Sequence, residues 1–318
     1  MSTLFLRASD VRALITMKET IEVVEEAFKE HARGKTQMPA KVYLNLDKGD
    51  FRAMPASLPG AAGLKWVNVH PGNPPLGLPT VMAVVIYNDP ETGYPLAVMD
   101  GTDTTAYRTG ATSAIAAKHL ARKDAATLGL IGAGHEAHTH LLAHVELFKF
   151  KSIRVYDINE SKAEKFVREF PDYPAKASSL EETVSSDIIC TLTPSRQPYL
   201  KKEWVKPGAH INAVGADAPG KEELEPAVLK SARVVVDNME QAVHGGEVNV
   251  PISRGLYLPE EIYGTLDEVV SGKKPGRANE REVTIFVSTG LAIEDVAVAK
   301  LLYEKAKKKG GYLTLDFV

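Results

Sequence analysis

The segment Thr127-Leu-Gly-Leu-Ile-Gly-Ala-Gly-His-Glu-Ala137 is followed along the chain by Ile153-Arg-Val-Tyr-Asp157. In this order the two segments predict a buried strand, a glycine turn, the start of a helix, and a second strand that ends in a carboxylate. Gly132 permits the tight turn, and Gly134 lets the backbone approach a pyrophosphate at the helix N-terminus. The combination is typical of a dinucleotide-binding βαβ unit.

Asp157 lies at the position where a side chain accepts hydrogen bonds from the ribose hydroxyls of such a cofactor. An acidic residue there repels a 2′-phosphate, so we expect NAD as the cofactor. NADP stays a weaker alternative, because Arg154 or Lys162 can turn toward a phosphate at this position. The residues that we expect to bind the cofactor are Gly132, Ala133, Gly134, His135, Glu136, Ala137, Asp157, Thr193 and Gly215.

The composition sets limits on the class of protein. A chain of 318 residues suggests two domains. Its 38 basic and 41 acidic residues leave no basic excess to suggest binding of nucleic acid or of an anionic membrane. The single cysteine, Cys190, lies in an apolar strand pattern and excludes an intramolecular disulfide. No signal-peptide pattern and no membrane-spanning run is present, so we expect a cytoplasmic protein.

The first third of the chain differs from a nucleotide-binding unit. Thr16 is the predicted N-cap of an amphipathic helix that ends near Gly34. Short strand patterns separated by Gly and Pro follow, and they predict an antiparallel or mixed sheet. These strands are expected at 41–46, 51–54, 63–69, 80–87 and 95–100, and a helix is expected at 102–119.

From residue 127 onward, strand and helix patterns alternate, which predicts a doubly wound parallel sheet. A long helix at 292–309 and a strand containing Leu313, Leu315 and Phe317 are expected to pack back on the first domain. The predicted fold is therefore α/β, with a Rossmann domain at 119–295. A discontinuous α+β substrate domain comprises 1–118 and 296–318.

Four basic side chains lie in apolar or turn-rich segments of the first domain, namely Lys41, Arg52, Lys65 and Arg108. Taken singly, each is more simply a surface charge with an apolar stem. Four in one small domain fit a carboxylate-binding site better, because Arg offers a planar fork and Lys a point charge.

Three other features have less specific signals. Asp217 follows a predicted strand at the ligand-binding edge of the sheet, where it is either a proton-transfer group or a turn residue. His140 and His144 are one helical turn apart, but no cysteine or carboxylate converges on them, so we expect no metal. The segment His244-Gly-Gly-Glu247 suggests a function that spacing alone does not define.

Ten motifs together resemble one known family and extend over nearly the whole chain. They are Arg52-Ala-Met-Pro55, Gly63-Leu-Lys-Trp-Val-Asn68, His70-Pro-Gly-Asn73, Gly77-Leu-Pro-Thr80, Pro95-Leu-Ala-Val-Met-Asp100, Arg108-Thr-Gly110, Gly132-Ala-Gly134, His210-Ile-Asn-Ala-Val-Gly-Ala-Asp217, His244-Gly-Gly-Glu-Val-Asn249 and Ser288-Thr-Gly-Leu-Ala-Ile-Glu-Asp-Val-Ala297. In this order they resemble the ornithine cyclodeaminase/μ-crystallin family, and within it most closely the archaeal alanine dehydrogenases.

The resemblance implies a Rossmann domain and a substrate domain that also forms a homodimer interface. It implies that Lys65 and Arg108 bind a substrate carboxylate, that Lys41 and Arg52 line the same pocket, and that Asp217 transfers protons. Asn68 and Thr80 fall in family motifs and are candidates for the pocket.

The branches of the family differ in their chemistry, which the fold alone does not decide. Ornithine cyclodeaminases carry an acid near the position of Arg52, where this chain has a cation. A second positive charge on the substrate would meet repulsion on the order of 4 kcal/mol per like pair at about 4 Å. We therefore expect NAD-dependent deamination of a small L-amino acid, L-alanine, to pyruvate and ammonia, and the reverse reaction.

Alternatives to this expectation stay open. The first alternative is a reductase of cyclic imines such as Δ1-pyrroline-2-carboxylate or Δ1-piperideine-2-carboxylate. The second is an ornithine cyclodeaminase. The least favoured is a protein that binds the cofactor without catalysing a reaction. For the dehydrogenase, Asp217 is the favoured base and Lys65 the rival, because neighbouring cations depress the pKa of a lysine.

Overall fold

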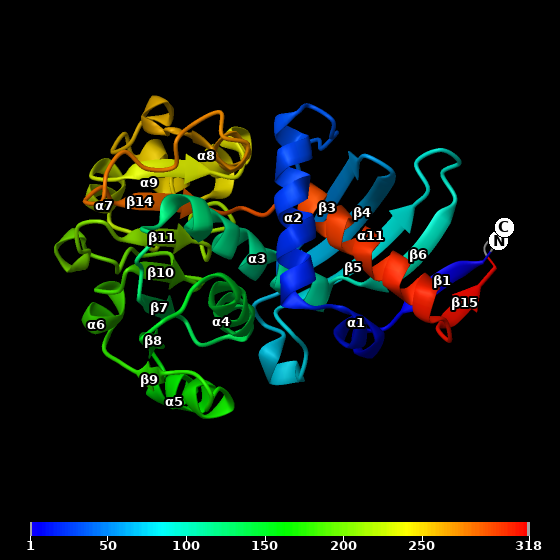
Figure 1. Ribbon diagram of the computed structural model, residues 1–318, viewed down its shortest axis with the longest axis horizontal. Helices are drawn as coiled ribbons and strands as arrows, with labels where there is room; N and C mark the ends of the chain where they lie inside the picture. The colour runs from blue at the N-terminus through cyan, green and yellow to red at the C-terminus, as the bar shows by residue number, and fades with distance from the viewer. Residues whose placement is uncertain (1, 317–318) are drawn as a thin grey trace. The chain divides into compact units, whose positions relative to one another are not determined.

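The computed structural model describes residues 2–316 of the chain, and Figure 1 shows its elements. The chain divides into two compact units, of which the first comprises Met1–Arg108 and Leu291–Val318 and the second Thr109–Gly290. The first division falls inside helix α3 (Thr102–Leu120), and the second falls just before helix α11 (Ala292–Lys309). No helix within residues 2–316 is long and apolar enough to cross a membrane.

The first unit contains a seven-stranded mixed sheet in the order β15-β1-β6-β5-β4-β3-β2. Only the pairing of β1 with β6 is parallel. The strands are β1 (Thr3–Leu6), β2 (Val42–Leu46), β3 (Gly49–Leu58), β4 (Ala61–Val69), β5 (Val81–Asn88), β6 (Pro95–Asp100) and β15 (Leu313–Leu315). The predicted mixed sheet is thus confirmed, while Phe317 of the predicted last strand lies outside the described residues.

Two features of this sheet differ from the prediction. Strand β1 and helix α1 (Ala8–Leu14) were not predicted, because elements this short carry little periodicity. Strand β3 continues to Leu58, although Pro55 suggested an earlier end. The β2–β3 ladder stops at Ala53, so Pro55 lies beyond it, where a missing N–H breaks no bond of that ladder.

One face of the mixed sheet is covered by helix α11, which contacts β3, β4 and β5. Helix α2 (Met17–Ala32) packs against α11, and its N-cap Thr16 accepts a hydrogen bond from the Glu19 backbone N–H, as predicted. Residues alternate between the two faces, so Lys65 and Val67 are buried whereas Trp66 between them is exposed. The predicted cation Lys65 therefore lies on an inner face of its unit.

The second unit contains an eight-stranded sheet in the order β13-β12-β14-β11-β10-β7-β8-β9, and all pairings are parallel. This confirms the predicted doubly wound parallel sheet. The strands are β7 (Thr127–Ile131), β8 (Ser152–Tyr156), β9 (Ala175–Ala177), β10 (Ile188–Thr191), β11 (His210–Ala213), β12 (Arg233–Val236), β13 (Gly264–Thr265) and β14 (Thr284–Val287). The chain changes direction across the sheet between β7 and β10, which is the switch point where such sheets bind ligands.

Seven helices of the second unit follow α3 in the described chain. Helix α4 (His135–Leu147) begins at the glycine turn, as predicted. The others are α5 (Glu160–Glu169), α6 (Leu180–Val184), α7 (Pro226–Lys230), α8 (Met239–Gly245), α9 (Asn249–Ser253) and α10 (Leu266–Val270). The first strand after the glycine turn and helix α5 confirm the βαβ order read from the sequence.

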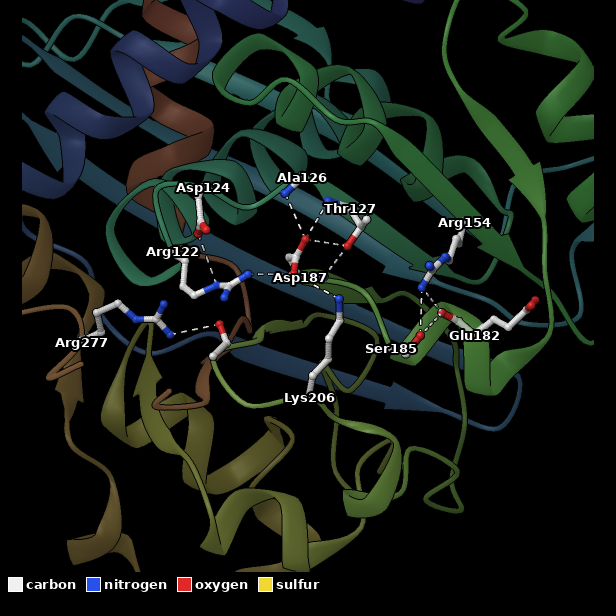
Figure 2. A network of polar contacts seen from close by, with 11 residues as sticks. Arg122, Asp124, Ala126, Thr127, Arg154, Glu182, Ser185, Asp187, Lys206 and Arg277 are labelled. Carbon is white, nitrogen blue, oxygen red and sulfur yellow. Dashed lines mark hydrogen bonds and ion pairs between the residues drawn. The ribbon is translucent and has the colours of Figure 1, made fainter. Parts of the chain in front are cut away.

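Asp187 connects the start of β10 to the start of β7 through hydrogen bonds, which Figure 2 shows. This is the end of the sheet opposite the glycine turn. Its Oδ2 accepts hydrogen bonds from the Ala126 and Thr127 backbone N–H groups at 3.0 and 2.9 Å. Arg122 and Lys206 lie 3.1 and 3.2 Å from its Oδ1. Burial alone would raise the pKa of Asp187, but these hydrogen bonds outweigh burial and lower the pKa to about 2.

Replacing Asp187 with Ala is expected to lower the free energy of unfolding by about 3 kcal/mol, because two backbone N–H groups lose their acceptor and both Arg122 and Lys206 lose an ion-pair contact. Urea denaturation followed by circular dichroism measures the loss. Asp124→Ala is the matched control, since Asp124 contacts the same Arg122 at 3.5 Å but is 77% exposed and should cost less than about 0.5 kcal/mol. Equal stability of the two variants would contradict the role given to Asp187.

Candidate functional site

The glycine turn leaves open space in front of helix α4. Gly132 has a φ of +100°, and a Cβ there would lie 3.0 Å from the Leu192 carbonyl oxygen, so only glycine fits without strain. A Cβ added to Gly134 would meet nothing within 4 Å. Helix α4 has Gly134 as its N-cap, with no side-chain cap for its first N–H groups. A helix N-terminus that is open in this way suits an anionic group.

Asp157 is fixed against the glycine turn. Its Oδ2 accepts a hydrogen bond from the Ala133 backbone N–H, and its Oδ1 accepts one from Asn159, each at 2.9 Å. Arg154 donates to the Glu182 carbonyl oxygen at 2.7 Å and to Ser185 Oγ at 2.9 Å, which Figure 2 shows. The guanidinium of Arg154 is thus directed to helix α6, which weakens its case as a phosphate-binding residue.

A cavity of about 300 Å³ adjoins the glycine turn. It is lined by Ala133, Gly134, His135, His138, Lys162, Lys165, Phe166 and Glu169. The glycine turn, the start of α4 and the length of α5 thus surround one space, whose lining includes three residues predicted to bind the cofactor. Of the predicted set, Glu136 is half-buried in the first turn of α4, and Ala137 is fully buried.

Thr193 and Gly215 come together at the carboxyl ends of β10 and β11. Both donate backbone hydrogen bonds to the buried carboxylate of Glu223, at 2.8 and 3.0 Å. Sequence reasoning missed Glu223, because it stands in the charged run Lys221-Glu-Glu-Leu-Glu225, which is typical of a solvated loop. No spacing signal separates it from its two acidic neighbours.

Asp217 lies two residues beyond Gly215 in the same loop and is half-buried. Lys221 contacts it, with Nζ 2.5 Å from Asp217 Oδ1 and 3.4 Å from the Gly215 carbonyl oxygen. The carboxylate of Asp217 therefore has a cation beside it. A role for Asp217 in catalysis stays a prediction.

Lys65 and Arg108 share one buried carboxylate in the first unit. Lys65 Nζ lies 2.8 Å from Asp295 Oδ2, and Arg108 Nε lies 3.1 Å from Asp295 Oδ1. Arg108 Nη1 also lies 2.9 Å from Glu294 Oε2. Burial and the charge of Arg108 lower the pKa of Lys65 to about 7, although Asp295 opposes this shift. The site thus holds two buried cations beside two buried acids.

The acidic partners at the start of α11 were missed by sequence reasoning. Glu294 and Asp295 are both fully buried, although each is a charged residue in the first turn of a helix. A signal was present, because Ile293 and Val296 flank them and place the pair in an apolar context. Acids at a helix N-terminus also interact favourably with its dipole, which is the simpler interpretation.

The other predicted substrate residues are only partly brought together. Arg52 contacts Asp50, with Nε 2.7 Å from Oδ1, and its guanidinium lies 5.3 Å from the centroid of the Tyr43 ring. Lys41 is half-buried just before β2, and its charge contributes to the lowered pKa of Lys65. Arg52 lies on the same sheet face as Lys65, because Met54 is two residues from Arg52 and pairs with Lys65.

Asn68 and Thr80 are not brought to Lys65. Asn68 lies three residues from Lys65 in β4 and so points to the opposite face of the sheet. Its Nδ2 lies 3.0 Å from His70 Nδ1. Thr80 lies just before β5, where its carbonyl oxygen accepts a hydrogen bond from the His70 backbone at 2.8 Å.

Two of the histidines of α4, His140 and His144, are buried and make hydrogen bonds inside the unit. His140 Nδ1 and His144 Nδ1 each donate to the carbonyl oxygen four residues earlier, at 2.7 Å. His144 Nε2 therefore accepts from Asn212 Nδ2 at 3.2 Å, and Asn212 Oδ1 accepts from His210 Nε2 at 3.0 Å. Burial lowers the pKa of His140 and His210 to about 3, and that of His144 to about 4. Within residues 2–316, no group of three or more His, Cys, Asp or Glu side chains is placed to hold a metal ion.

Protonation of His144 would turn its Nε2 into a donor that faces another donor, the Nδ2 group of Asn212. The pKa of His144 in the folded chain, about 4, lies below its ordinary value of 6.5, so the unfolded chain takes up the proton first as the pH falls. Its contribution to stability is complete above pH 6.5 and decreases as the pH falls toward 4. In His144→Gln, the slope of the unfolding free energy against pH in this range should be smaller by about 1.4 kcal/mol per pH unit. Denaturant unfolding at several pH values tests this, and a wild-type slope in the variant would contradict it.

The parallel sheet with a glycine turn at its switch point, joined to a mixed-sheet unit with buried cations, defines a two-unit α/β protein of the Rossmann type. Comparison of the amino-acid sequence with protein-family models identifies the particular family. The chain belongs to the ornithine cyclodeaminase/mu-crystallin family, whose family model matches residues 1–310. The resemblance read from the motifs is thereby confirmed.

Relatives in two branches are similar over the whole chain. The alanine dehydrogenase of Archaeoglobus fulgidus is 54% identical over 97% of each chain. A solved archaeal alanine dehydrogenase dimer with bound NAD is 53% identical, with a TM-score of 0.98 over 100% of both chains. The Δ1-pyrroline-2-carboxylate reductase of Thermococcus litoralis, solved with NADH and L-proline, is 40% identical, with a TM-score of 0.96 over 98% of this chain and 100% of that one.

Proposed function

We propose that the protein is an NAD-dependent L-amino acid dehydrogenase that converts L-alanine to pyruvate and ammonia and catalyses the reverse amination. The observation that supports the proposal is the buried pair Lys65 and Arg108, two cations of the kind that bind a carboxylate, in a chain 54% identical to an alanine dehydrogenase. Arg supplies a bidentate fork and Lys a point charge, so together they favour a small anionic substrate.

The residues of the second unit fit a bound dinucleotide. The open N-terminus of α4 suits the pyrophosphate, and Gly132 allows the backbone to turn there. The carboxylate of Asp157 suits the ribose hydroxyls of NAD and disfavours a 2′-phosphate. When bound, NAD supplies the two-electron oxidising power for the Cα–N bond of the amino acid.

The chain's own residues then provide binding and proton transfer. Lys65 and Arg108 hold the carboxylate and orient Cα, with Lys41 and Arg52 adding positive charge, and such positioning supplies much of the acceleration. The substrate ammonium must lose a proton before oxidation, and Asp217 accepts it. Asp217 releases this proton to solvent before water adds to the iminium carbon of the substrate, and it then takes a proton from that water. It returns the proton to the amino group of the resulting carbinolamine, so ammonia leaves while the carbinolamine hydroxyl loses its proton and becomes the carbonyl of pyruvate.

Lys65 is the rival base, because with a pKa of about 7 its amine is neutral in a substantial fraction of the molecules near neutral pH. Its contact with Asp295 at 2.8 Å favours the charged form, however, and the charged form is the one that binds a carboxylate. We therefore assign substrate binding to Lys65 and proton transfer to Asp217.

Reduction of a cyclic imine is the second candidate function. It uses the same carboxylate-binding cations, and the relative from Thermococcus litoralis is a Δ1-pyrroline-2-carboxylate reductase. The experiment that separates the two is a comparison of kcat/KM for NADH oxidation with pyruvate plus ammonium and with Δ1-pyrroline-2-carboxylate. We expect the higher kcat/KM with pyruvate plus ammonium. The opposite order would assign the protein to the reductase branch, and NAD-dependent ammonia release from ornithine would assign it to the cyclodeaminase branch.

We also propose a homodimer formed through the outer face of the mixed sheet. Val42, Ala53, Trp66 and Val84 pair in one cross-strand row on that face. Val42, Trp66 and Val84 are 65%, 40% and 45% exposed, which is unusual for adjacent large apolar side chains. A second copy of the chain is the proposed occupant, because the solved relative that is 53% identical is described as a dimer.

Trp66→Glu is expected to yield a monomer at micromolar concentration, because the interface would bury an unpaired charge. Light scattering after size-exclusion chromatography measures the mass. Leu256→Glu, at an exposed apolar position of the second unit, is the control and should match the wild type. A dimeric Trp66→Glu variant would remove this face from the interface.

A further inference from the structure

The segment His244-Gly-Gly-Glu247 and the missed residue Glu223 belong to one buried cluster. Glu223 is fully buried and receives five hydrogen bonds. Its Oε1 accepts from the Thr193 N–H at 2.8 Å, and from the hydroxyls of Thr193 and Tyr199 at 2.7 Å. Its Oε2 accepts from the Thr191 hydroxyl at 2.7 Å and from the Gly215 N–H at 3.0 Å.

Four of these five hydrogen bonds, those from Thr191, Thr193 and Gly215, come from residues at or just beyond the two strand ends where ligands bind in open parallel sheets. Thr191 ends β10 and Gly215 follows the end of β11. A Cβ on Gly215 would lie 2.6 Å from Glu223 Oε2, so the carboxylate approaches the backbone as closely as glycine allows. Because Glu223 is fully buried, it holds these segments from inside the unit and does not itself face a ligand.

Glu247 supports Glu223 in turn. Its Oε1 accepts hydrogen bonds from the Glu223 and Leu224 backbone N–H groups at 2.8 and 2.6 Å. Within the described residues, no hydrogen-bond partner is found for its Oε2. Glu247 is fully buried as well, so two acidic side chains share one buried site.

The contacts indicate which acid carries the charge. The N–H groups of Thr193 and Gly215 only donate, so Glu223 satisfies them best as a carboxylate. Burial, and then the charge on Glu223, raise the pKa of Glu247 well above its ordinary value. Burial also raises the pKa of Glu223, but its hydrogen bonds from Thr193 and Thr191 oppose the shift. Glu223 accepts five hydrogen bonds over its two oxygens, whereas Glu247 accepts two on one oxygen, so the charge is better satisfied on Glu223 and Glu247 is the neutral member of the pair.

We propose that Glu223 is a positioning residue that holds Thr193 and Gly215 in the conformation that binds the nicotinamide cofactor, and that Glu247 is its protonated support. The inference rests on the proposed use of a nicotinamide cofactor and on the prediction from the sequence that Thr193 and Gly215 bind it. It gives the acid of the His244-Gly-Gly-Glu247 motif a role that does not require contact with the substrate.

The test is a fluorescence titration of NADH without any substrate. Glu223→Gln replaces one acceptor with a donor that faces Thr193 or Gly215, and it should raise the Kd for NADH at least about tenfold. Glu247→Gln resembles the neutral acid in shape and charge, so its Kd should stay within about threefold of the wild type. Thr191→Val removes one of the five donors and, as the milder variant, should raise the Kd about fivefold.

Glu222→Gln is the matched control. Glu222 is the adjacent buried acid, but its partner is Arg254 at 3.3 Å and not the ends of β10 and β11. Its Kd for NADH should equal that of the wild type, whatever the change costs in stability. Thermal unfolding of each variant fixes a temperature at which all of them are folded.

Wild-type affinity in both Glu223→Gln and Thr191→Val would overturn the inference, as would an equal loss in Glu222→Gln. An equal loss in Glu247→Gln would overturn the assignment of the proton. The titration needs no turnover, so an error about the amino acid substrate leaves the result unchanged. A wild-type protein that binds no NADH would overturn both the inference and the proposed function.

Discussion

Asp217→Asn is expected to lower kcat for the amination of pyruvate by at least about 10²-fold. The amide keeps the size of the side chain but cannot accept the proton of the attacking water or of the substrate ammonium. The Kd for NADH should stay within about threefold, because Asp217 is not among the residues predicted to bind the cofactor. Steady-state rates at saturating NADH, together with NADH fluorescence titration, measure the two quantities.

Lys221→Met is the companion variant for Asp217. Lys221 lies 2.5 Å from Asp217 Oδ1, so its removal leaves the carboxylate in place without its cation. We expect a smaller loss of kcat, about tenfold or less, since half-buried ion pairs contribute modestly. Near-normal turnover in Asp217→Asn would remove Asp217 from the mechanism and transfer the role of base to Lys65.

Lys65→Met is expected to lower kcat/KM for pyruvate by about 10²- to 10³-fold, because a buried cation that binds the substrate carboxylate is lost. The same change leaves the buried carboxylate of Asp295 beside Arg108 without Lys65, and it should also destabilise the unit. The double variant Lys65→Met/Asp295→Asn separates the two effects. It should regain stability while kcat/KM stays low, and recovery of activity would contradict a binding role for Lys65.

The pH dependence distinguishes binding by Lys65 from base catalysis by Lys65. With a pKa of about 7, the charged form of Lys65 decreases as the pH rises through 7. If that form binds the carboxylate, kcat/KM for pyruvate should fall above pH 7, and Lys65→Arg should lose this limb because Arg stays protonated. If Lys65 acts as the base in deamination, the rate would instead rise through pH 7 and Lys65→Arg would be inactive.

The elements of the second unit were largely predictable because their signals are local. Alternating strand and helix patterns, the glycine turn at Gly132 and the carboxylate of Asp157 all lie within short windows of sequence. The N-cap at Thr16 and the long helix α11 were predictable for the same reason. The short elements β1 and α1 were not, since they span too few residues to show a period.

The polar partners of the site residues were not predictable in this way. Lys65 and Arg108 meet Asp295, which is far away in the sequence, and the pairing depends on how α11 packs on the sheet. Glu223 is likewise distinguished from Glu222 and Glu225 only by where the loop runs. The position of Asn68, by contrast, could have been predicted, because the alternation of side chains along a strand places it on the sheet face opposite Lys65.

The central claim is that the protein joins ammonia to a 2-keto acid at the expense of NADH. The direct measurement is the incorporation of ¹⁵N from labelled ammonium into L-alanine, with pyruvate and NADH, followed by mass spectrometry alongside NADH absorbance. We predict one labelled L-alanine formed per NADH consumed, and no NADH consumption when ammonium is left out. NADH oxidation with pyruvate that proceeds equally well without ammonium, or no oxidation with pyruvate under either condition, would contradict the account.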